Sequence, residues 1–107
     1  MNRKGPPKVL VMGAGGIGGT VTAYLSEVGT DVVASTTNQA IFDAVTTQGY
    51  RIAGDGNPRA VQGRISMGPP EGEVFDYILL ATQPPQVEEA ARTALPHLAD
   101  GGRMVVF

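Results

Sequence analysis

The stretch that decides the fold lies at residues 8–19 and reads KVLVMGAGGIGG. Its first five residues form a short apolar run, which is typical of a buried strand. The run passes directly into the pattern G-x-G-x-x-G, whose glycines are Gly13, Gly15 and Gly18. Apolar residues at helical spacing follow over residues 17–28. A strand, a glycine turn and a helix in this order are typical of a dinucleotide-binding site.

The three glycines of this turn have different predicted roles. Gly13 permits a tight turn off the strand, Gly15 lets a pyrophosphate approach the backbone, and Gly18 lets the helix pack against the strand. Unpaired amides at the helix start, together with the helix dipole, favour negative phosphates. A glycine turn can also be purely structural, but the flanking strand and helix favour dinucleotide binding. The chain lacks G-K-[ST], so a P-loop phosphate site is not supported.

The rest of the chain continues the alternation of strands and helices, which predicts an α/β, Rossmann-type parallel sheet with flanking helices and a small antiparallel hairpin insertion. The buried face of the first helix is predicted to consist of Ile17, Val21, Tyr24, Leu25 and Val28. The predicted strands lie at 8–12, 31–35, 50–53, 76–81 and 103–107, with an antiparallel hairpin arm at 59–67. The predicted helices lie at 17–28, 39–48 and 87–98, the last kinked or shortened by Pro96.

Composition excludes several classes of protein. The chain has 107 residues, of which 42% are hydrophobic, and this fits one domain. A net charge of −2 without a basic patch argues against nucleic-acid binding. The absence of cysteine excludes disulfides, thiolate catalysis and cysteine-ligated metals, and no cluster has metal-ligand spacing. No apolar run approaches the ~20 residues that span a bilayer. We therefore expect a cytoplasmic protein that binds neither membranes nor metals.

The domain organisation is predicted from the two ends of the chain. Residues 1–7 read as a loose tail, and residues 8–107 read as the cofactor domain. The last predicted strand has the composition of an interior strand in a larger sheet. We therefore expect the natural protein to continue past Phe107 into a further domain. The surface bared at this point is expected to favour self-association.

The end of the second predicted strand indicates the cofactor preference. NAD sites usually carry an acidic residue about 20 positions past the glycine turn, which bonds the ribose hydroxyls. Here the strand ends in Ser35, Thr36, Thr37 and Asn38, and Asp31 lies before it. Because no carboxylate is present to repel a 2′-phosphate, the sequence favours NADP (NADPH) over NAD. Thr37 or Asn38 can also simply cap the next helix.

Three segments together resemble the ketopantoate reductase (2-dehydropantoate 2-reductase) family: residues 8–19, residues 29–33, and residues 77–83 followed by 86–90. The similarity runs from Lys8 to Phe107. The resemblance implies an enzyme that reduces a 2-keto acid to a 2-hydroxy acid with NADPH. It also implies a Rossmann domain joined to an all-helical C-terminal domain, with the keto-acid substrate in the cleft between them. This chain alone is then expected to have no turnover.

Two positions depart from the family pattern. The family places an arginine that grips the 2′-phosphate at or near Thr37, and a lysine that meets cofactor and substrate at the position of Gln83. Glutamine can hydrogen-bond but offers no charge to a carboxylate substrate. Two alternatives therefore stay open: another two-domain hydroxyacid dehydrogenase, and a nucleotide-sensing module without catalysis.

The remaining polar residues are interpreted as structural, and no catalytic residue is assigned. His97, Asp76, Glu88 and Glu89 are expected to be exposed, solvated or capping groups. The residues predicted to contact the cofactor are Gly13, Ala14, Gly15, Gly16, Ile17, Gly18, Thr36, Thr37, Asn38, Thr82 and Gln83.

Overall fold

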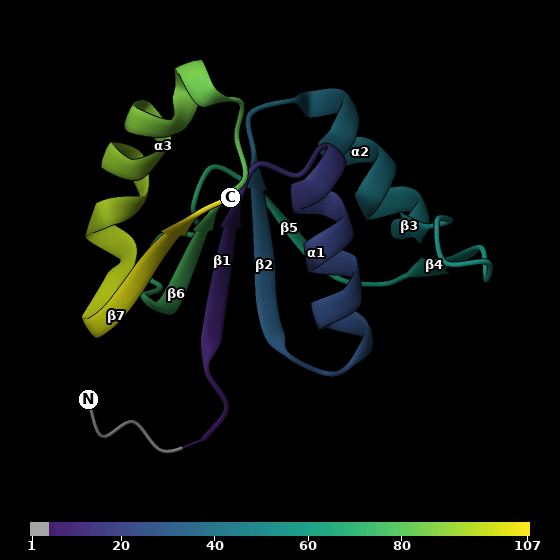
Figure 1. The fold of residues 1–107 in the computed structure, drawn as a ribbon, viewed down its shortest axis with the longest axis horizontal. Helices are drawn as coiled ribbons and strands as arrows, with labels where there is room; N and C mark the ends of the chain where they lie inside the picture. Colours follow the sequence, from purple (N-terminus) through teal and green to yellow (C-terminus); the bar gives the residue numbers. More distant parts are fainter. Residues whose placement is uncertain (1–4) are drawn as a thin grey trace.

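Five parallel strands form the central sheet of the computed structural model, which describes residues 5–107 (Figure 1). Their order is β5-β2-β1-β6-β7, so the chain begins in the middle of the sheet and later crosses to its other half. A separate antiparallel pair consists of β3 and β4. The strands are β1 Lys8–Met12, β2 Asp31–Thr36, β3 Tyr50–Ile52, β4 Arg59–Val61, β5 Arg64–Met67, β6 Phe75–Leu80 and β7 Leu98–Val106. The predicted fold class is confirmed.

Three α-helices connect these strands, and two short 3₁₀ helices flank the last of them. The α-helices are α1 Gly16–Glu27, α2 Gln39–Gln48 and α3 Val87–Ala94, and the 3₁₀ helices are η1 Pro84–Gln86 and η2 Leu95–His97. Over the described residues, none of these helices has the length and apolar character needed to cross a membrane. Of the predicted tail, residues 1–4 lie outside the described part, and residues 5–7 are exposed and precede β1.

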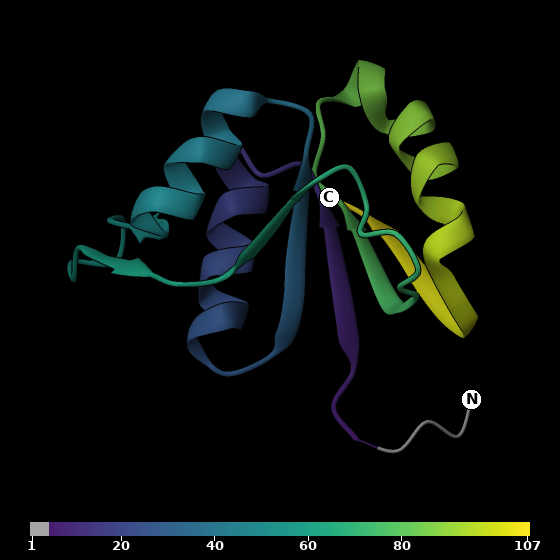
Figure 2. The same ribbon diagram turned by 180° about the vertical axis from the view of Figure 1, so that it is seen from behind.

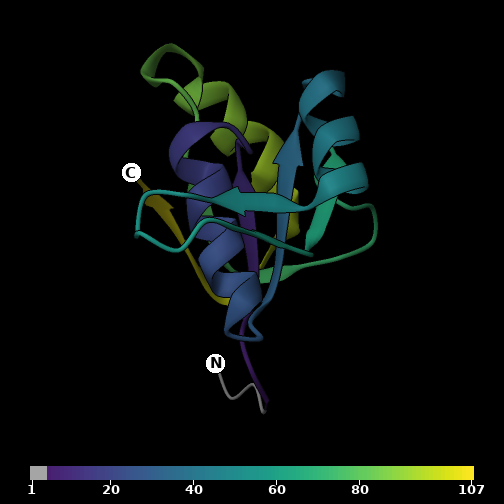
Figure 3. The same cartoon turned by 90° about the vertical axis from the view of Figure 1, so that its right-hand side faces the viewer.

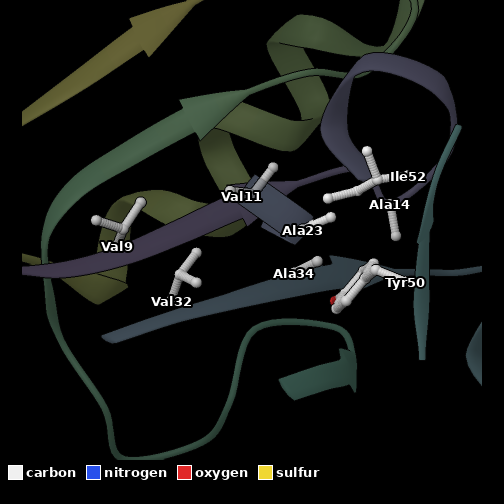
Figure 4. Close-up of a cluster of buried hydrophobic side chains, with 8 residues drawn as sticks. All are labelled: Val9, Val11, Ala14, Ala23, Val32, Ala34, Tyr50 and Ile52. Carbon is white, nitrogen blue, oxygen red and sulfur yellow. The ribbon is translucent and has the colours of Figure 1, made fainter. Parts of the chain in front are cut away.

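Two apolar clusters cover the two faces of the sheet, because side chains alternate along a strand. Val9 and Val11 belong to the cluster beneath α1 and α2 (Figure 4). Leu10 and Met12 belong to the cluster beneath α3. In Figure 2, α1 and α2 accordingly lie on one side of β1 and α3 lies on the other. Strand β1 is therefore buried on both faces, which explains its continuous apolar run.

The predicted buried face of α1 is confirmed only in part, because Leu25 packs against the core and Val21 is half-buried. The residues that it buries are Gly18, Thr22 and Ala23. Three of the predicted residues are exposed instead: Ile17 (65%), Tyr24 (38%) and Val28 (75%). The reason is close packing, because a Cβ atom on Gly18 would overlap the Gly13 carbonyl at the end of β1. Only small side chains fit where the helix approaches the strand this closely.

The hairpin arm predicted at 59–67 is confirmed in its first half and wrong in its second. Strand β4 pairs antiparallel with β3, and Figure 3 shows this pair lying across α1. Strand β5 instead pairs parallel with β2 and forms one edge of the main sheet. The Tyr50 hydroxyl links the two parts by donating to the Arg64 carbonyl at 2.6 Å. Burial raises the pKa of Tyr50 to about 12.

Ion pairs link the segment from β3 to β5 to the rest of the domain. Arg59 donates to Glu27 at the end of α1 and also pairs with Asp55 at 3.0 Å. These hydrogen bonds from Arg59 lower the pKa of both carboxyl groups. Arg64 pairs with Glu73 at 2.8 Å. Arg59 and Arg64 therefore have structural partners at the surface of the domain.

The segment after β6 also differs from the prediction. Helix α3 ends at Ala94 and passes into the η2 turn, because Pro96 lacks an amide for the helical ladder. Strand β7 begins at Leu98, five residues before the predicted start, and a register shift opposite Phe75 and Tyr77 accommodates the extra length. Asp76 is buried rather than solvated and accepts a 2.8 Å hydrogen bond from the Lys8 amide. His97 is half-buried, with Nδ1 at 2.9 Å from the Glu73 carbonyl.

Candidate functional site: a dinucleotide cradle at the carboxyl ends of the strands

The glycine turn joins β1 to α1 at the carboxyl end of the sheet, where parallel α/β folds bind their ligands. Gly13 has a φ of +103°, which favours glycine, and its amide donates to the Ser35 carbonyl at 2.8 Å. A Cβ atom on Gly13 would lie 3.0 Å from the Ala81 carbonyl oxygen. The turn is therefore held between the ends of β2 and β6, as its predicted role requires.

The other two glycines of the turn differ in their surroundings. Gly18 is buried behind the turn and packs against the Gly13 carbonyl, so it serves the packing of α1. Gly15 is exposed, and a Cβ atom there would meet only the Ile41 side chain, at an ordinary 3.7 Å. The fold itself therefore leaves room for a side chain at Gly15. The bare backbone at this position fits a ligand that must come close.

The start of α1 carries no side chain that would compete with an anion. Its N-cap is Gly15, which makes no side-chain cap, and its first turn contains no acidic residue. Helix N-termini leave amide donors that point along the axis and carry partial positive charge. An unopposed helix start beside an exposed glycine is suited to a diphosphate.

Two adjoining cavities extend from this turn. The larger, of about 740 Å³, is lined by the glycine turn, by Thr36 and Thr37 at the end of β2, by the segment after β6 and by Phe107. The smaller, of about 260 Å³, lies between the end of β2, the loop at residues 68–69 and α3. Both cavities are lined by Gly13, Thr36, Thr37, Thr82 and Gln86. A ligand longer than a mononucleotide can therefore occupy both, with its middle at the glycine turn.

The end of β2 supplies hydroxyl groups and an amide. Ser35 and Thr36 are buried, and the Thr36 hydroxyl accepts a 3.0 Å hydrogen bond from the Asn38 amide. Asn38 caps α2, because its side chain accepts from the Ile41 amide at 3.1 Å. Thr37 is exposed and lines both cavities. Capping thus accounts for Asn38, whereas Thr37 faces the space a ligand would fill.

The segment after β6 contributes side chains rather than bare backbone. The Thr82 hydroxyl oxygen is buried and has no hydrogen-bond partner among the described residues. A buried hydroxyl without a partner is costly, so a polar group from a ligand or solvent is expected beside it. Gln83 is exposed at the mouth of the larger cavity, and its carbonyl accepts a 2.8 Å bond from the Gln86 amide. The Gln83 side chain remains available to a ligand.

The structure brings most of the predicted cofactor residues together. The members that line the larger cavity are Gly13, Ala14, Gly15, Gly16, Ile17, Thr36, Thr37, Thr82 and Gln83. Gly18 and Asn38 do not line it, because they pack the helix and cap α2 respectively. Across residues 5–107, no group of acidic or histidine side chains could hold a metal ion.

Sequence reasoning missed the contribution of α3. Gln86, Glu89 and Thr93 line the smaller cavity. Their spacing of three and four residues places them on one face of a helix, and this polar stripe is visible in the sequence. The apolar residues on the opposite face of this helix predict only that it packs against the core. Only the fold shows that the stripe faces the end of β2.

The observed parts fit a bound dinucleotide. Three features lie beside the adjoining cavities. They are the exposed Gly15, the start of α1 without a capping side chain, and the buried Thr82 hydroxyl without a partner among the described residues. Gly13, Thr37, Thr82 and Gln86 line both cavities, and the glycine turn, where a diphosphate would lie, lines the larger one next to this junction. This is the arrangement expected at the switch point of a doubly wound sheet, here between β1 and β6.

Comparisons with known proteins agree with this arrangement. Residues 9–107 match the family model described as ketopantoate reductase PanE/ApbA. A PanE/ApbA family ketopantoate reductase from Ralstonia eutropha is similar in structure, with a TM-score of 0.80, 25% identity, and coverage of 91% of this chain and 32% of that chain. No curated protein sequence matches significantly.

Two further solved structures share the fold at lower identity. A 2-dehydropantoate 2-reductase from Porphyromonas gingivalis has a TM-score of 0.77 at 22% identity, covering 94% of this chain and 37% of that one. A D-mandelate dehydrogenase, solved with NADH and anilino(oxo)acetate, has a TM-score of 0.81 at 19% identity, covering 94% and 32%. The chain thus spans about a third of the length of the structures it resembles.

Proposed function

The chain belongs to the ketopantoate reductase family, and on that premise we propose that it is the NADP-binding domain of an oxidoreductase that converts a 2-keto acid to a 2-hydroxy acid. The observation that carries the proposal is the exposed Gly15 beside the uncapped start of α1. A bare backbone and free amides at one point favour a diphosphate over other ligands.

The residues of the chain would bind and orient the cofactor. When bound, the reduced nicotinamide supplies a hydride to the substrate carbonyl. The α1 amides would hold the diphosphate, and the Thr82 hydroxyl would donate to or accept from a polar group at the junction of the cavities. We expect the proton donor to lie outside residues 1–107. This chain alone should then bind the cofactor without turnover.

Preference for NADP is supported by the end of β2. No carboxylate stands among residues 35–38, so at the end of β2 a 2′-phosphate would meet hydroxyl and amide groups. Thr37 is the exposed member of this group that faces the cavities. It is therefore the residue at which the preference can be changed.

The direct test is calorimetric titration of the chain with NADPH and with NADH. We expect NADPH to bind about tenfold more tightly, the effect of roughly 1.4 kcal/mol from the 2′-phosphate. Thr37→Asp should reverse the order, because a carboxylate repels the phosphate and bonds ribose hydroxyls, while Thr37→Asn should preserve it. Tighter binding of NADH by the unaltered chain would contradict the NADP preference, and binding of neither would contradict the whole proposal.

A second candidate is the cofactor domain of a different 2-hydroxyacid dehydrogenase, favoured by Gln83. A neutral amide at the mouth of the larger cavity offers a substrate hydrogen bonds but no countercharge. Substrate profiling of a longer chain that includes residues 1–107 separates the two. Activity confined to keto acids other than ketopantoate would favour this candidate.

A further inference from the structure

The smaller cavity carries a polar wall that the proposed function leaves without a role. We propose that Glu89 of α3 recognises the adenine base of the cofactor by accepting a hydrogen bond from its exocyclic amine. Thr93, one helical turn further along, would hydrogen-bond the same edge of the base. This inference rests on the proposed function, since it assumes that a pyridine dinucleotide binds at the glycine turn.

The position of the cavity assigns it to the adenosine half of the cofactor. In doubly wound folds the residue after the second strand contacts the adenine ribose. Thr36, the last residue of β2, and Thr37 line both cavities, whereas Ser35 of β2 and the loop at residues 68–69 line only the smaller one. The larger cavity extends the other way, towards Phe107 after β7. A dinucleotide with its diphosphate at the glycine turn therefore has its adenine on the side of α3.

The walls of the smaller cavity suit a flat purine. Met12, Pro69 and Ala90 provide apolar surface, and Met12 and Ala90 belong to the core beneath α3. A cavity of about 260 Å³ that combines this apolar surface with hydrogen-bonding side chains is suited to a planar base with polar edges. The acidic group among its lining residues is Glu89.

Glu89 is free to accept a hydrogen bond from a ligand. Among residues 5–107 it makes no ion pair and no side-chain hydrogen bond, whereas its neighbour Glu88 pairs with Arg92 at 3.0 Å and faces solvent. Helical geometry turns adjacent residues to different faces, so only one of the two glutamates reaches the cavity. Both glutamates lie in the first turn of α3, but only Glu88 is engaged in an ion pair within the helix.

The chemistry of a carboxylate discriminates between purines. Adenine presents an amine at its sixth position, which donates to an ionised carboxylate that can only accept. Hypoxanthine presents a carbonyl oxygen at the same position, which the carboxylate repels. The Thr93 hydroxyl both donates and accepts, so it can complement the ring nitrogens of either base. Glu89 is therefore expected to set the preference for adenine.

The test compares, by calorimetric titration, two cofactors that differ only on this edge of the purine, NADPH and reduced nicotinamide hypoxanthine dinucleotide phosphate, in which the amine is replaced by a carbonyl and the neighbouring ring nitrogen carries a proton. We expect the unaltered chain to bind NADPH about tenfold more tightly, as for a hydrogen bond to an exposed charged group. Glu89→Gln should reduce the preference to about twofold or less, because an amide can accept from adenine and donate to hypoxanthine. Glu88→Gln is the matched control and should retain the full preference.

The outcomes of these titrations distinguish the role of Glu89 from the proposed function. Equal binding of the two dinucleotides by the unaltered chain, or a preference that Glu89→Gln leaves unchanged, would overturn the role of Glu89 while the proposed function stands. Failure to bind either dinucleotide would overturn both. Because Glu89 is exposed on a helix, we expect thermal unfolding of Glu89→Gln to coincide with that of the parent chain. Thr93→Val provides a second variant, which is expected to lower the affinity for both cofactors equally.

Discussion

Two turns meet at the proposed cofactor site, and they contribute to it in opposite ways. The turn after β1 offers backbone: Gly13 and Gly18 are required by steric contacts within the fold, and Gly15 leaves an open approach. The turn after β6 offers side chains, the buried Thr82 hydroxyl and the exposed Gln83 amide. The first turn therefore determines the class of ligand, and the second can vary to determine which member of the class is bound and what reacts with it.

The largest expected effect comes from Gly18, where the fold itself requires glycine. A Cβ atom there would overlap the Gly13 carbonyl, which is backbone and cannot move aside as a side chain would. Gly18→Ala should lower the free energy of unfolding by about 3 kcal/mol or more. Urea unfolding followed by circular dichroism measures it. A loss below about 1 kcal/mol would mean that α1 can shift away from β1.

Gly15 tests whether the same turn separates folding from binding. Gly15→Ala adds a Cβ atom that meets only the Ile41 side chain at 3.7 Å, so the unfolding free energy should stay within about 1 kcal/mol. The methyl group would occupy the approach of the diphosphate, and NADPH affinity should fall at least about tenfold. Calorimetry beside urea unfolding resolves the two effects. Unchanged affinity would show that the ligand does not come close to this glycine.

The contrast between the turns also explains what could be predicted from the sequence. The glycine turn, the parallel sheet and the clustering of Thr37, Thr82 and Gln83 follow from local rules, since the carboxyl ends of parallel strands share one edge. The role of Glu89 could not be found in this way, because it depends on the orientation of α3 relative to β2. A polar stripe on a helix usually faces solvent.

Two of the sequence predictions are wrong for the same reason. Both depend on contacts between residues that are far apart in the sequence. Apolar periodicity assigned Ile17 to the buried face of α1, but Gly18 brings the helix so close to β1 that small residues take that face. Alternation assigned β5 to the hairpin, but Ile65 packs against the core cluster and the strand joins β2. Periodicity identifies an element, whereas its partner is decided by tertiary packing.

A smaller effect is expected at Thr82, where the second turn holds a buried hydroxyl without a described partner. Thr82→Val is nearly isosteric and removes that polar group. The free chain should become more stable, by up to about 1 kcal/mol, because an unsatisfied buried hydroxyl is lost. NADPH affinity should fall several-fold, since the same group would meet the cofactor. Stabilisation with unchanged affinity would indicate that solvent, rather than ligand, satisfies this hydroxyl.

The smallest expected effect is at Gln83, the position where the resemblance to the family implies a lysine. Gln83→Lys places an ammonium group at the exposed mouth of the larger cavity, near the proposed diphosphate. The attraction is partly screened by solvent, so NADPH affinity should rise only about two- to threefold at low salt. The gain should vanish as ionic strength rises, while Gln83→Met, with no charge, should show neither behaviour. Titrations at two salt concentrations measure it. A gain that persists at high salt would mean that the lysine is held against the cofactor by a specific hydrogen bond, and the second turn would then contribute binding energy comparable with the first.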